Sequence, residues 1–398
     1  MTAVGSLRLV GSAGPSVDAG GDHTVVRAQL RRDDLLGGFR IPPGGEAGTP
    51  PELRRPGGTV GDDGRADVRL MVAHRGRDRV THGRFADVVD VLAPGDVVVV
   101  NASAVLPAAL DARGPDGSVL RLHLSTEQPG GYWVVEPRRP AGPGSERFVG
   151  QPPRSLALPG DGHAELLAPY PPAGGVPRLW LARLDLPDPA GDHTGHGDAG
   201  DHGDYLAAHG QPIRYAHSDR AWPIEAYQTV FSRVPGSVEM PSAARPFTHE
   251  LVTRLVARGV TVVPVVLHTG VSSQEAGEAP YAERYEVPVA TADIVNAART
   301  AGGRVIAAGT TVVRALESTA DPAGRSHPGR GWTELVVTPQ RGVRVIDGLI
   351  TGWHEPESSH LALLEAVAGR RTLEVSYREA VRSRYLWHEF GDSHLILP

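Results

Sequence analysis

A short apolar run between glycines, followed by a helical pattern, constrains the fold more than any other part of the chain. Residues 304–308 (RVIAA) are rich in β-branched and small side chains and have glycines on both sides, which is typical of a buried strand. Val312, Val313 and Leu316 then recur at helical spacing. Thr310 or Thr311 could cap that helix. A buried strand that leads through a tight turn into an amphipathic helix predicts an α/β fold.

The opposite stripe of the same helix carries polar side chains. Thr310, Arg314 and Glu317 fall at positions i, i+4 and i+7, so they share one side of a helix. Ligands of open α/β sheets collect outside the carboxyl ends of the strands. This stripe could therefore form one wall of a ligand site. The alternative is a capped helix with a surface Arg–Glu pair, and this stretch alone favours neither interpretation.

Other predicted strands also end in polar residues. His268 and Thr269 follow the apolar run 260–267, Asn101 follows another buried strand, and His354 follows an apolar pair. A lone histidine is more often a hydrogen-bonded structural group than a catalyst. The turns at His268-Thr269, Thr310-Thr311 and His354 share the same strand-to-helix topology, so we expect them to line a common cleft.

Composition excludes several classes of chemistry. The chain has 398 residues, no cysteine and no lysine, so all 40 basic residues are Arg. Thiolate nucleophiles, Cys-ligated metals, Schiff bases and a phosphate-loop Lys are therefore excluded. The net charge of -6 argues against nucleic-acid binding by bulk charge, although a local Arg patch is compatible with it. No apolar run reaches membrane-spanning length, and we expect a soluble cytoplasmic protein without a membrane partner.

Changes in composition and hydrophobic pattern along the chain predict its domains. Residues 1–38 are rich in Gly, Ala and Ser and should form a flexible extension. Residues 39–107 and 207–398 carry the α/β pattern, with a mixed, largely parallel sheet expected. Residues 108–206 contain short alternating runs between Gly/Pro turns, which predict a small inserted antiparallel barrel or sandwich.

Three local features complete the prediction from the residues. The His/Asp/Gly-rich segment 192–205 could hold a metal, but a polar loop is the preferred interpretation because its glycines would leave ligands unfixed. Thr248 should cap a helix that ends at Gly259. Residues 334–337 and 343–346 look like the two arms of a hairpin.

The chain resembles the S-adenosylmethionine:tRNA ribosyltransferase-isomerase family of the queuosine pathway from about Phe39 to its C-terminus. The resemblance rests on a series of motifs in order: FRIPP, FADVVDVLAPGDVVVVN, YQTVFSRVPGSVEMPSA, GVTVVPVVLHTG, GGRVIAAGTTVVRALES, GWTELVVTP, DGLITGWHEPESS and YREAVRSRY followed by GD. It implies an α/β domain with an inserted small β-barrel.

The resemblance also implies a reaction. The family transfers and isomerises the ribosyl part of S-adenosylmethionine onto the aminomethyl group of a 7-deazaguanine base in a tRNA anticodon, releasing adenine and methionine. The sulfonium cation acidifies the protons on the neighbouring 5′ carbon, so a base is needed, and adenine leaves more easily when protonated. S-adenosylmethionine would be the co-substrate, and no metal or redox cofactor is required.

Carried over position by position, the resemblance implies a set of site residues. Glu283 and His354 are the candidates for proton transfer, and Arg314 with Glu317 would orient a polar ligand. The remaining candidates would contact substrate: Asn101, Tyr227, Gln228, Phe247, His268, Thr269, Thr310, Thr311, Trp353 and Ser358. The rings of Tyr227 and Trp353 could stack on adenine or face the sulfonium. For Trp353 we favour the alternative, ordinary core packing.

The chain departs from the family pattern at several positions. The usual Asn-Asp-Thr-Arg is replaced by residues 101–104 (NASA), and the usual Gly-Leu-His-Phe by residues 244–247 (ARPF). Glu355 and Glu357 add carboxylates, which should weaken contact with a phosphate backbone. Two alternatives to the family activity are therefore considered. One is the same chemistry on a small-molecule acceptor, or as a lyase or hydrolase, and the other is a non-catalytic nucleoside- or RNA-binding paralogue.

Overall fold

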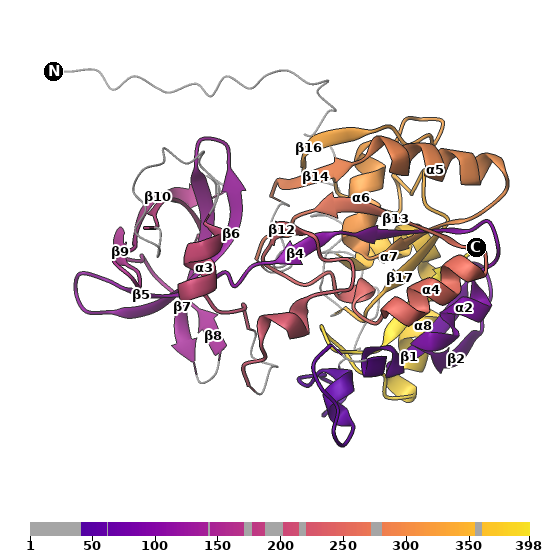
Figure 1. Cartoon of the computed structure of the whole chain (residues 1–398), viewed down its shortest axis with the longest axis horizontal. Helices are drawn as coiled ribbons and strands as arrows, with labels where there is room; N and C mark the ends of the chain where they lie inside the picture. The colour runs from indigo at the N-terminus through magenta and orange to yellow at the C-terminus, as the bar shows by residue number, and fades with distance from the viewer. Residues whose placement is uncertain are drawn as a thin grey trace.

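The computed structural model describes residues 41–61, 63–141, 144–170, 177–187, 202–214, 220–271, 281–354 and 360–398. The expected extension 1–38, Glu355, Glu357 and Ser358 lie outside these residues. The described chain forms a nine-stranded sheet, a seven-stranded sheet and a two-stranded sheet. The strands of the seven-stranded sheet group at one end of the molecule, at the left of Figure 1, beside the larger α/β part.

The nine-stranded sheet is mixed, as expected, and its centre is parallel. Its strands run in the order β16 (Gly329–Thr333), β14 (Glu283–Val287), β13 (Thr261–Leu267), β3 (Val97–Asn101), β15 (Val305–Ala308), β17 (Gly348–Thr351), β18 (Ser393–Leu397), β1 (Arg69–His74) and β2 (Val80–Arg84). The neighbours β13, β3, β15 and β17 pair in parallel. Their carboxyl ends therefore meet at one edge of the sheet.

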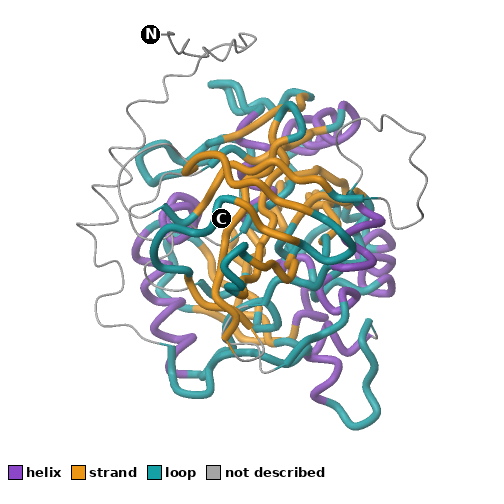
Figure 2. The backbone as a smooth tube through the Cα atoms, turned by 90° about the vertical axis from the view of Figure 1, so that its left-hand side faces the viewer, coloured by secondary structure: helices purple, strands orange, loops and turns teal. Residues whose placement is uncertain are grey.

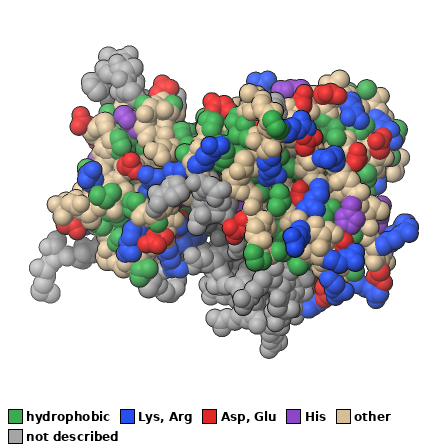
Figure 3. All heavy atoms as spheres, turned by 90° about the horizontal axis from the view of Figure 1, so that it is seen from below, with side chains coloured by type: hydrophobic (Ala, Val, Ile, Leu, Met, Phe, Trp, Pro, Cys, Tyr) green, Lys and Arg blue, Asp and Glu red, His purple; other side chains and the backbone are tan. Residues whose placement is uncertain are grey.

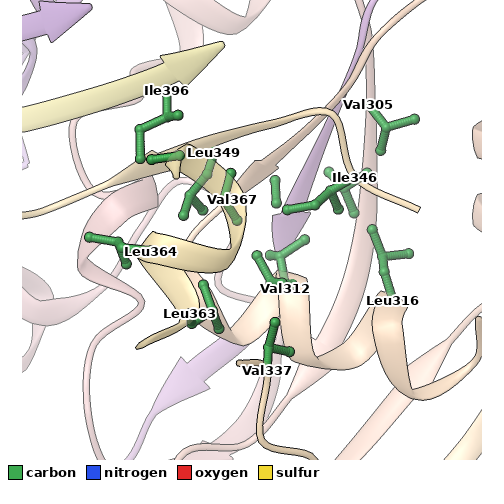
Figure 4. Close-up of a cluster of buried hydrophobic side chains, with 14 of the residues drawn as sticks. Val305, Val312, Leu316, Val337, Ile346, Leu349, Leu363, Leu364, Val367 and Ile396 are labelled. Carbon is green, nitrogen blue, oxygen red and sulfur yellow. The ribbon is translucent and has the colours of Figure 1, made fainter. Parts of the chain in front are cut away.

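Helices cover both faces of this sheet (Figure 2). Along β3, Val97 and Val99 enter one core cluster, while Val98 and Val100 enter another, because successive side chains of a strand point to opposite faces. The first face packs against α5 (Val289–Thr300), α6 (Thr310–Ser318), α7 (His360–Ala368) and α8 (Arg370–Arg382), and Figure 4 shows part of this core. The second packs against α2 (Val88–Val91) and α4 (His249–Ala257). Two covered faces explain the continuous apolar runs of the central strands.

Helix boundaries follow the expected chemistry at one site and depart from it at another. The hydroxyl of Thr248 accepts a hydrogen bond from Leu251 N at 3.0 Å, which confirms the predicted cap of α4. The prediction that Thr310 or Thr311 caps α6 is wrong. The N-cap of α6 is Gly309, which has a φ of 108° and makes no side-chain cap. A backbone in this region favours glycine, and the sharp turn places both threonines inside the first helical turn.

The predicted hairpin of residues 334–337 and 343–346 is also wrong, because neither segment is a strand. The backbone N–H groups of Arg344 and Val345 donate instead to the carboxylate of Glu317, at 2.8 and 2.9 Å. A side chain therefore takes the hydrogen bonds that a strand partner would otherwise accept. Most of residues 192–205 are not described, but Gly203–His209 form helix α3, so the expected polar loop ends before Gly203.

The seven-stranded sheet is antiparallel and has its own core. Its order is β11 (Leu179–Asp185), β10 (His163–Tyr170), β9 (Ser155–Ala157), β5 (Ala109–Arg113), β6 (Val119–Gln128), β7 (Tyr132–Ala141) and β8 (Gly144–Arg147), and β11 also pairs with β7. A parallel pair of β4 (Ser103–Val105) and β12 (Val234–Ser237) connects the two larger sheets. Within the described residues, no helix is both long and apolar enough to cross a membrane.

Candidate active site

Polar residues follow four neighbouring parallel strands at the carboxyl edge of the large sheet. Asn101 ends β3, His268 follows β13, Thr310 begins α6 after β15, and His354 lies three residues beyond β17. The seven-stranded sheet contacts the same edge, because Val271 N donates a hydrogen bond to the hydroxyl of Ser125 on β6 at 3.0 Å. The strand order places these strand ends at one edge of the sheet, and the common cleft stays a prediction.

Asn101 ties three of these strand ends together. Its buried amide donates to Leu267 O at 2.8 Å and to the hydroxyl of Thr311 at 3.3 Å. Its carbonyl oxygen accepts from the backbone N–H groups of Leu267 and Ser103, each at 3.1 Å. The amide thus holds β3, β13 and the start of α6 in register. Its hydrogen-bonding groups are used by the protein.

His268 is part of a buried hydroxyl network. Its Nδ1 lies 2.8 Å from the hydroxyl of Ser103, which lies 2.6 Å from the hydroxyl of Ser237. Thr269 N donates to Ser237 at 3.1 Å, and the Thr269 hydroxyl donates to Glu239 O at 3.1 Å. Burial, and then the positive charge of Arg284, lower the pKa of His268 to about 4. The ring is therefore neutral at pH 7.

Glu283 and Arg314 form a buried ion pair at the edge of the site. The side chains are 8% and 16% exposed, and Arg314 NH1 contacts Glu283 Oε2. Arg314 also donates to Leu335 O and Thr333 O, each at 3.2 Å. The other carboxylate oxygen accepts from Gly270 N at 3.3 Å. This pair joins β14, α6, β16 and the turn after β13, so Glu283 and Arg314 lie together as expected.

His354 forms a stacked pair with a second histidine. Its ring stacks on His360, with centroids 4.5 Å apart and planes at 8°. Its Nε2 is 3.1 Å from the hydroxyl of Thr351, and its backbone N–H donates to the hydroxyl of Tyr377 at 3.4 Å. Burial, and then the charges of His360 and His388, hold the pKa of His354 well below its ordinary value. The pKa of His360 is lowered to about 4 by burial and by Arg314. The charge of Arg314 therefore acts on the second histidine of the stacked pair.

Two candidate residues have structural partners instead of a free face toward the site. Glu317 is buried, and besides the two backbone N–H groups it accepts from Arg341 Nη1 at 2.9 Å. Its carboxylate therefore holds residues 341–345, and a role in orienting a ligand stays a prediction. Trp353 is 3% exposed and stacks on His394 with centroids 4.7 Å apart. Its ring also packs against Tyr377 and Trp387, so Trp353 belongs to the core, the alternative that we favoured.

Three further candidates also pack against other protein groups. Phe247 is fully buried, and its ring packs against those of Phe85 and Phe231. The ring of Tyr227 is 7% exposed and lies 5.6 Å from that of Phe390. The Gln228 side chain pairs with the backbone of Val105, accepting at 3.0 Å and donating at 2.9 Å. All three side chains thus have partners within the protein.

Several residues of the site were not predicted. Ser103 was noted only as a departure from the family pattern, and Ser237 and His360 were not considered. Ser237 lies far from Ser103 and His268 in sequence, so only the fold brings the three together. His360 begins α7, six residues after His354, and this short separation in sequence is the feature that could have indicated it.

Comparison with known proteins identifies the family. The family model described as queuosine biosynthesis protein matches residues 39–396. The chain belongs to this family. It is 37% identical to the S-adenosylmethionine:tRNA ribosyltransferase-isomerase of Thermus thermophilus over 340 residues, covering 83% of this chain and 92% of that protein. It is 36% identical to the enzyme of the same name from Synechococcus elongatus over 346 residues, covering 84% and 90%.

A solved structure is also similar to the chain. The S-adenosylmethionine tRNA ribosyltransferase of Thermotoga maritima is 28% identical and aligns over 90% of this chain and 99% of that one, with a TM-score of 0.48. The family resemblance inferred from the motifs is confirmed, and so is the expectation of an enzyme of the transferase-isomerase class.

Proposed function

We propose that this protein transfers and isomerises the ribosyl part of S-adenosylmethionine onto an amine of a 7-deazaguanine base in tRNA, releasing adenine and methionine. Membership of the queuosine biosynthesis family supports the reaction. One observation supports the assignment of the site: the Glu283–Arg314 ion pair and the stacked pair of His354 and His360 both follow strands of the large sheet, and the charge of Arg314 acts on His360.

His354 is the proposed base that removes a proton from carbon 5′. Its lowered pKa keeps the imidazole neutral at pH 7, so a nitrogen lone pair is available to accept a proton. The hydroxyl of Thr351 and the stacked ring of His360 fix its orientation. The sulfonium next to carbon 5′ makes that proton acidic, which reduces the basicity that the reaction demands.

Glu283 is the proposed second proton-transfer group, and Arg314 is its positioning partner. The ion pair and the hydrogen bond from Gly270 N hold the carboxylate in place between β14 and the turn after β13. Thr310 and Thr311, at the start of α6, would donate hydrogen bonds to substrate oxygens. A carboxylate at this edge also suits a cationic nucleoside electrostatically.

The seven-stranded sheet is proposed to be the small inserted β-barrel of the family, within residues 108–206. The additional pairing of β11 with β7 supports this, because it closes the strands β11, β10, β9, β5, β6 and β7 into a ring. We propose 39–107 and 207–398 as the catalytic domain. On the face seen in Figure 3, Arg and acidic side chains are interspersed, so contact of this face with tRNA would use local groups.

The experiment is an assay of product release. Purified protein is incubated with S-adenosylmethionine alone and then together with a tRNA that carries the 7-deazaguanine base with its aminomethyl group, and adenine and methionine are quantified. Release that requires the modified tRNA supports the proposal. Release without tRNA would indicate a small-molecule acceptor, lyase or hydrolase. A protein that neither binds S-adenosylmethionine nor releases adenine would be a non-catalytic relative.

A further inference from the structure

A chain of buried hydroxyl groups ends on one nitrogen of His268. Thr269 N donates to the hydroxyl of Ser237, which is 2.6 Å from that of Ser103, and Ser103 is 2.8 Å from His268 Nδ1. Ser103 and Ser237 are both 0% exposed. Their hydroxyl hydrogens therefore have to find acceptors within this chain of groups, because an unpaired buried donor is costly.

Among the described residues, one direction of hydrogen bonding satisfies both hydroxyl groups. The Ser237 hydroxyl contacts Thr269 N, which is a donor, and the Ser103 hydroxyl, so the acceptor for its own hydrogen is Ser103. Ser103 must then donate its hydrogen to His268 Nδ1. In the reverse direction, with Nδ1 as a donor to Ser103, one serine hydrogen would lack an acceptor. His268 Nδ1 is therefore an acceptor and carries no proton.

We infer that Ser103 and Ser237 fix His268 as the tautomer with its proton on Nε2, and that this N–H donates to an oxygen of the substrate. This inference rests on the proposed function for the identity of the substrate. Ser103 and Ser237 are positioning residues, and His268 is the group that contacts the ligand. Replacement of the usual family threonine by Ser103 retains the hydroxyl that the chain of groups requires.

The surroundings of Nε2 agree with this role. Nε2 has no hydrogen-bond partner among the described residues, and the residue is 8% exposed. The lowered pKa of His268 keeps the ring neutral, so Nδ1 remains a lone-pair acceptor at pH 7. Gly236, at φ 148°, packs so closely that an added Cβ would come within 2.5 Å of Nδ1. The ring is thereby confined.

The oxygen that Nε2–H binds should be anionic. His268 N donates to Arg284 O at 3.0 Å, so the two residues are neighbours, and the positive charge of Arg284 acts on the ring. A donor N–H near a positive charge is a favourable place for an oxyanion. Two parts of the proposed substrates supply one: the carboxylate of S-adenosylmethionine and a phosphate of the tRNA. The shared chemistry is an oxyanion at the carboxyl end of β13, and binding assays with each substrate separate the two sources.

The tautomer is tested directly by nitrogen NMR. The two ring nitrogens of a neutral histidine have well-separated ¹⁵N shifts, according to which one carries the proton. The chain has 17 histidines, so the His268 signal is assigned by its loss in His268→Gln. We expect protonated Nε2 at pH 7.5, a changed Nδ1 shift in Ser103→Ala and a shift close to wild type in Ser103→Thr. A proton on Nδ1 in the wild-type protein would overturn the inference.

The ligand contact is tested by binding. His268→Ala should weaken the binding of one of the two substrates by roughly ten- to a hundredfold, the usual range for one hydrogen bond to a charged group. His268→Gln keeps an N–H near the position of Nε2 and should recover most of that loss. Calorimetry with S-adenosylmethionine and a titration with tRNA show which oxyanion is bound. Unchanged affinity for both would overturn the contact.

Failure of the proposed function gives a different pattern. A wild-type protein that binds neither S-adenosylmethionine nor tRNA would contradict the proposed function and the ligand contact together. The NMR measurement needs no substrate, so the tautomer would still be decided in that case.

Discussion

Replacing Glu283 by Gln should stop adenine release and lower stability by a moderate amount. Glutamine keeps the shape of the side chain and can still accept from Gly270 N, but it removes the negative charge beside Arg314. Breaking a buried ion pair by removing one partner costs about 3–5 kcal/mol. We expect a value near 3 kcal/mol, the lower limit, since Arg314 keeps Thr333 O and Leu335 O as acceptors. A lost proton-transfer group slows turnover by about 10²- to 10⁴-fold.

The assay combines adenine release at saturating substrates with urea unfolding of the same preparations. Glu286→Gln is the matched control, because Glu286 lies on the same strand and is exposed. It should change stability by less than about 0.5 kcal/mol and leave release unchanged. Near-normal turnover in Glu283→Gln would remove this carboxylate from the mechanism. Equal losses in both variants would assign the effect to the charge of the strand and not to the site.

The other predictions concern residues that the structure places in or behind the site. His354→Ala should abolish adenine release while far-UV circular dichroism stays unchanged; retained release would exclude His354 as the base. Glu317→Ala should accelerate hydrogen exchange at Arg344 N and Val345 N by about a hundredfold or more, since both lose a charged acceptor; unchanged exchange would refute its structural role. Burial lowers the pKa of His394 to about 3. The unfolded chain takes up that proton near pH 6.5, so stability should fall as pH drops from about 6.5 toward 3. His394→Phe keeps the stack on Trp353 and should flatten the fall in urea midpoint between pH 7 and 5, and an unaltered slope would contradict this.

The parallel centre of the sheet could be predicted because its information is local. Apolar runs bounded by glycines and followed by helical periodicity identified β13, β15 and the helices beside them. Polar residues directly after such runs marked the edge where ligands bind in α/β folds. That argument needed no tertiary contact, which is why Asn101, His268 and His354 were found at one edge of the sheet.

The predictions failed where a residue distant in sequence supplied the hydrogen-bond partner that a neighbouring segment was expected to supply. Residues 343–346 have strand-like alternation, but the carboxylate of Glu317 takes the N–H groups of Arg344 and Val345, so no hairpin forms. Helical spacing placed Glu317 beside Arg314, yet the two side chains have different partners. Periodicity assigns a residue to a stripe of a helix and does not show which segment of the chain packs over that stripe.

The electrostatics of the site make chemical sense for a cationic substrate. Burial lowers the pKa of His268, His354 and His360, so these three rings are neutral at pH 7. The charge of Arg314 is compensated by Glu283 at direct contact. A sulfonium entering between these groups would therefore meet lone pairs and neutral rings rather than several like charges, whose repulsion at short range in a partly buried site would amount to several kcal/mol. The same burial that weakens the histidines as bases thus removes the repulsion that would keep the sulfonium away from them, and the acidity of its 5′ protons offsets the lost basicity.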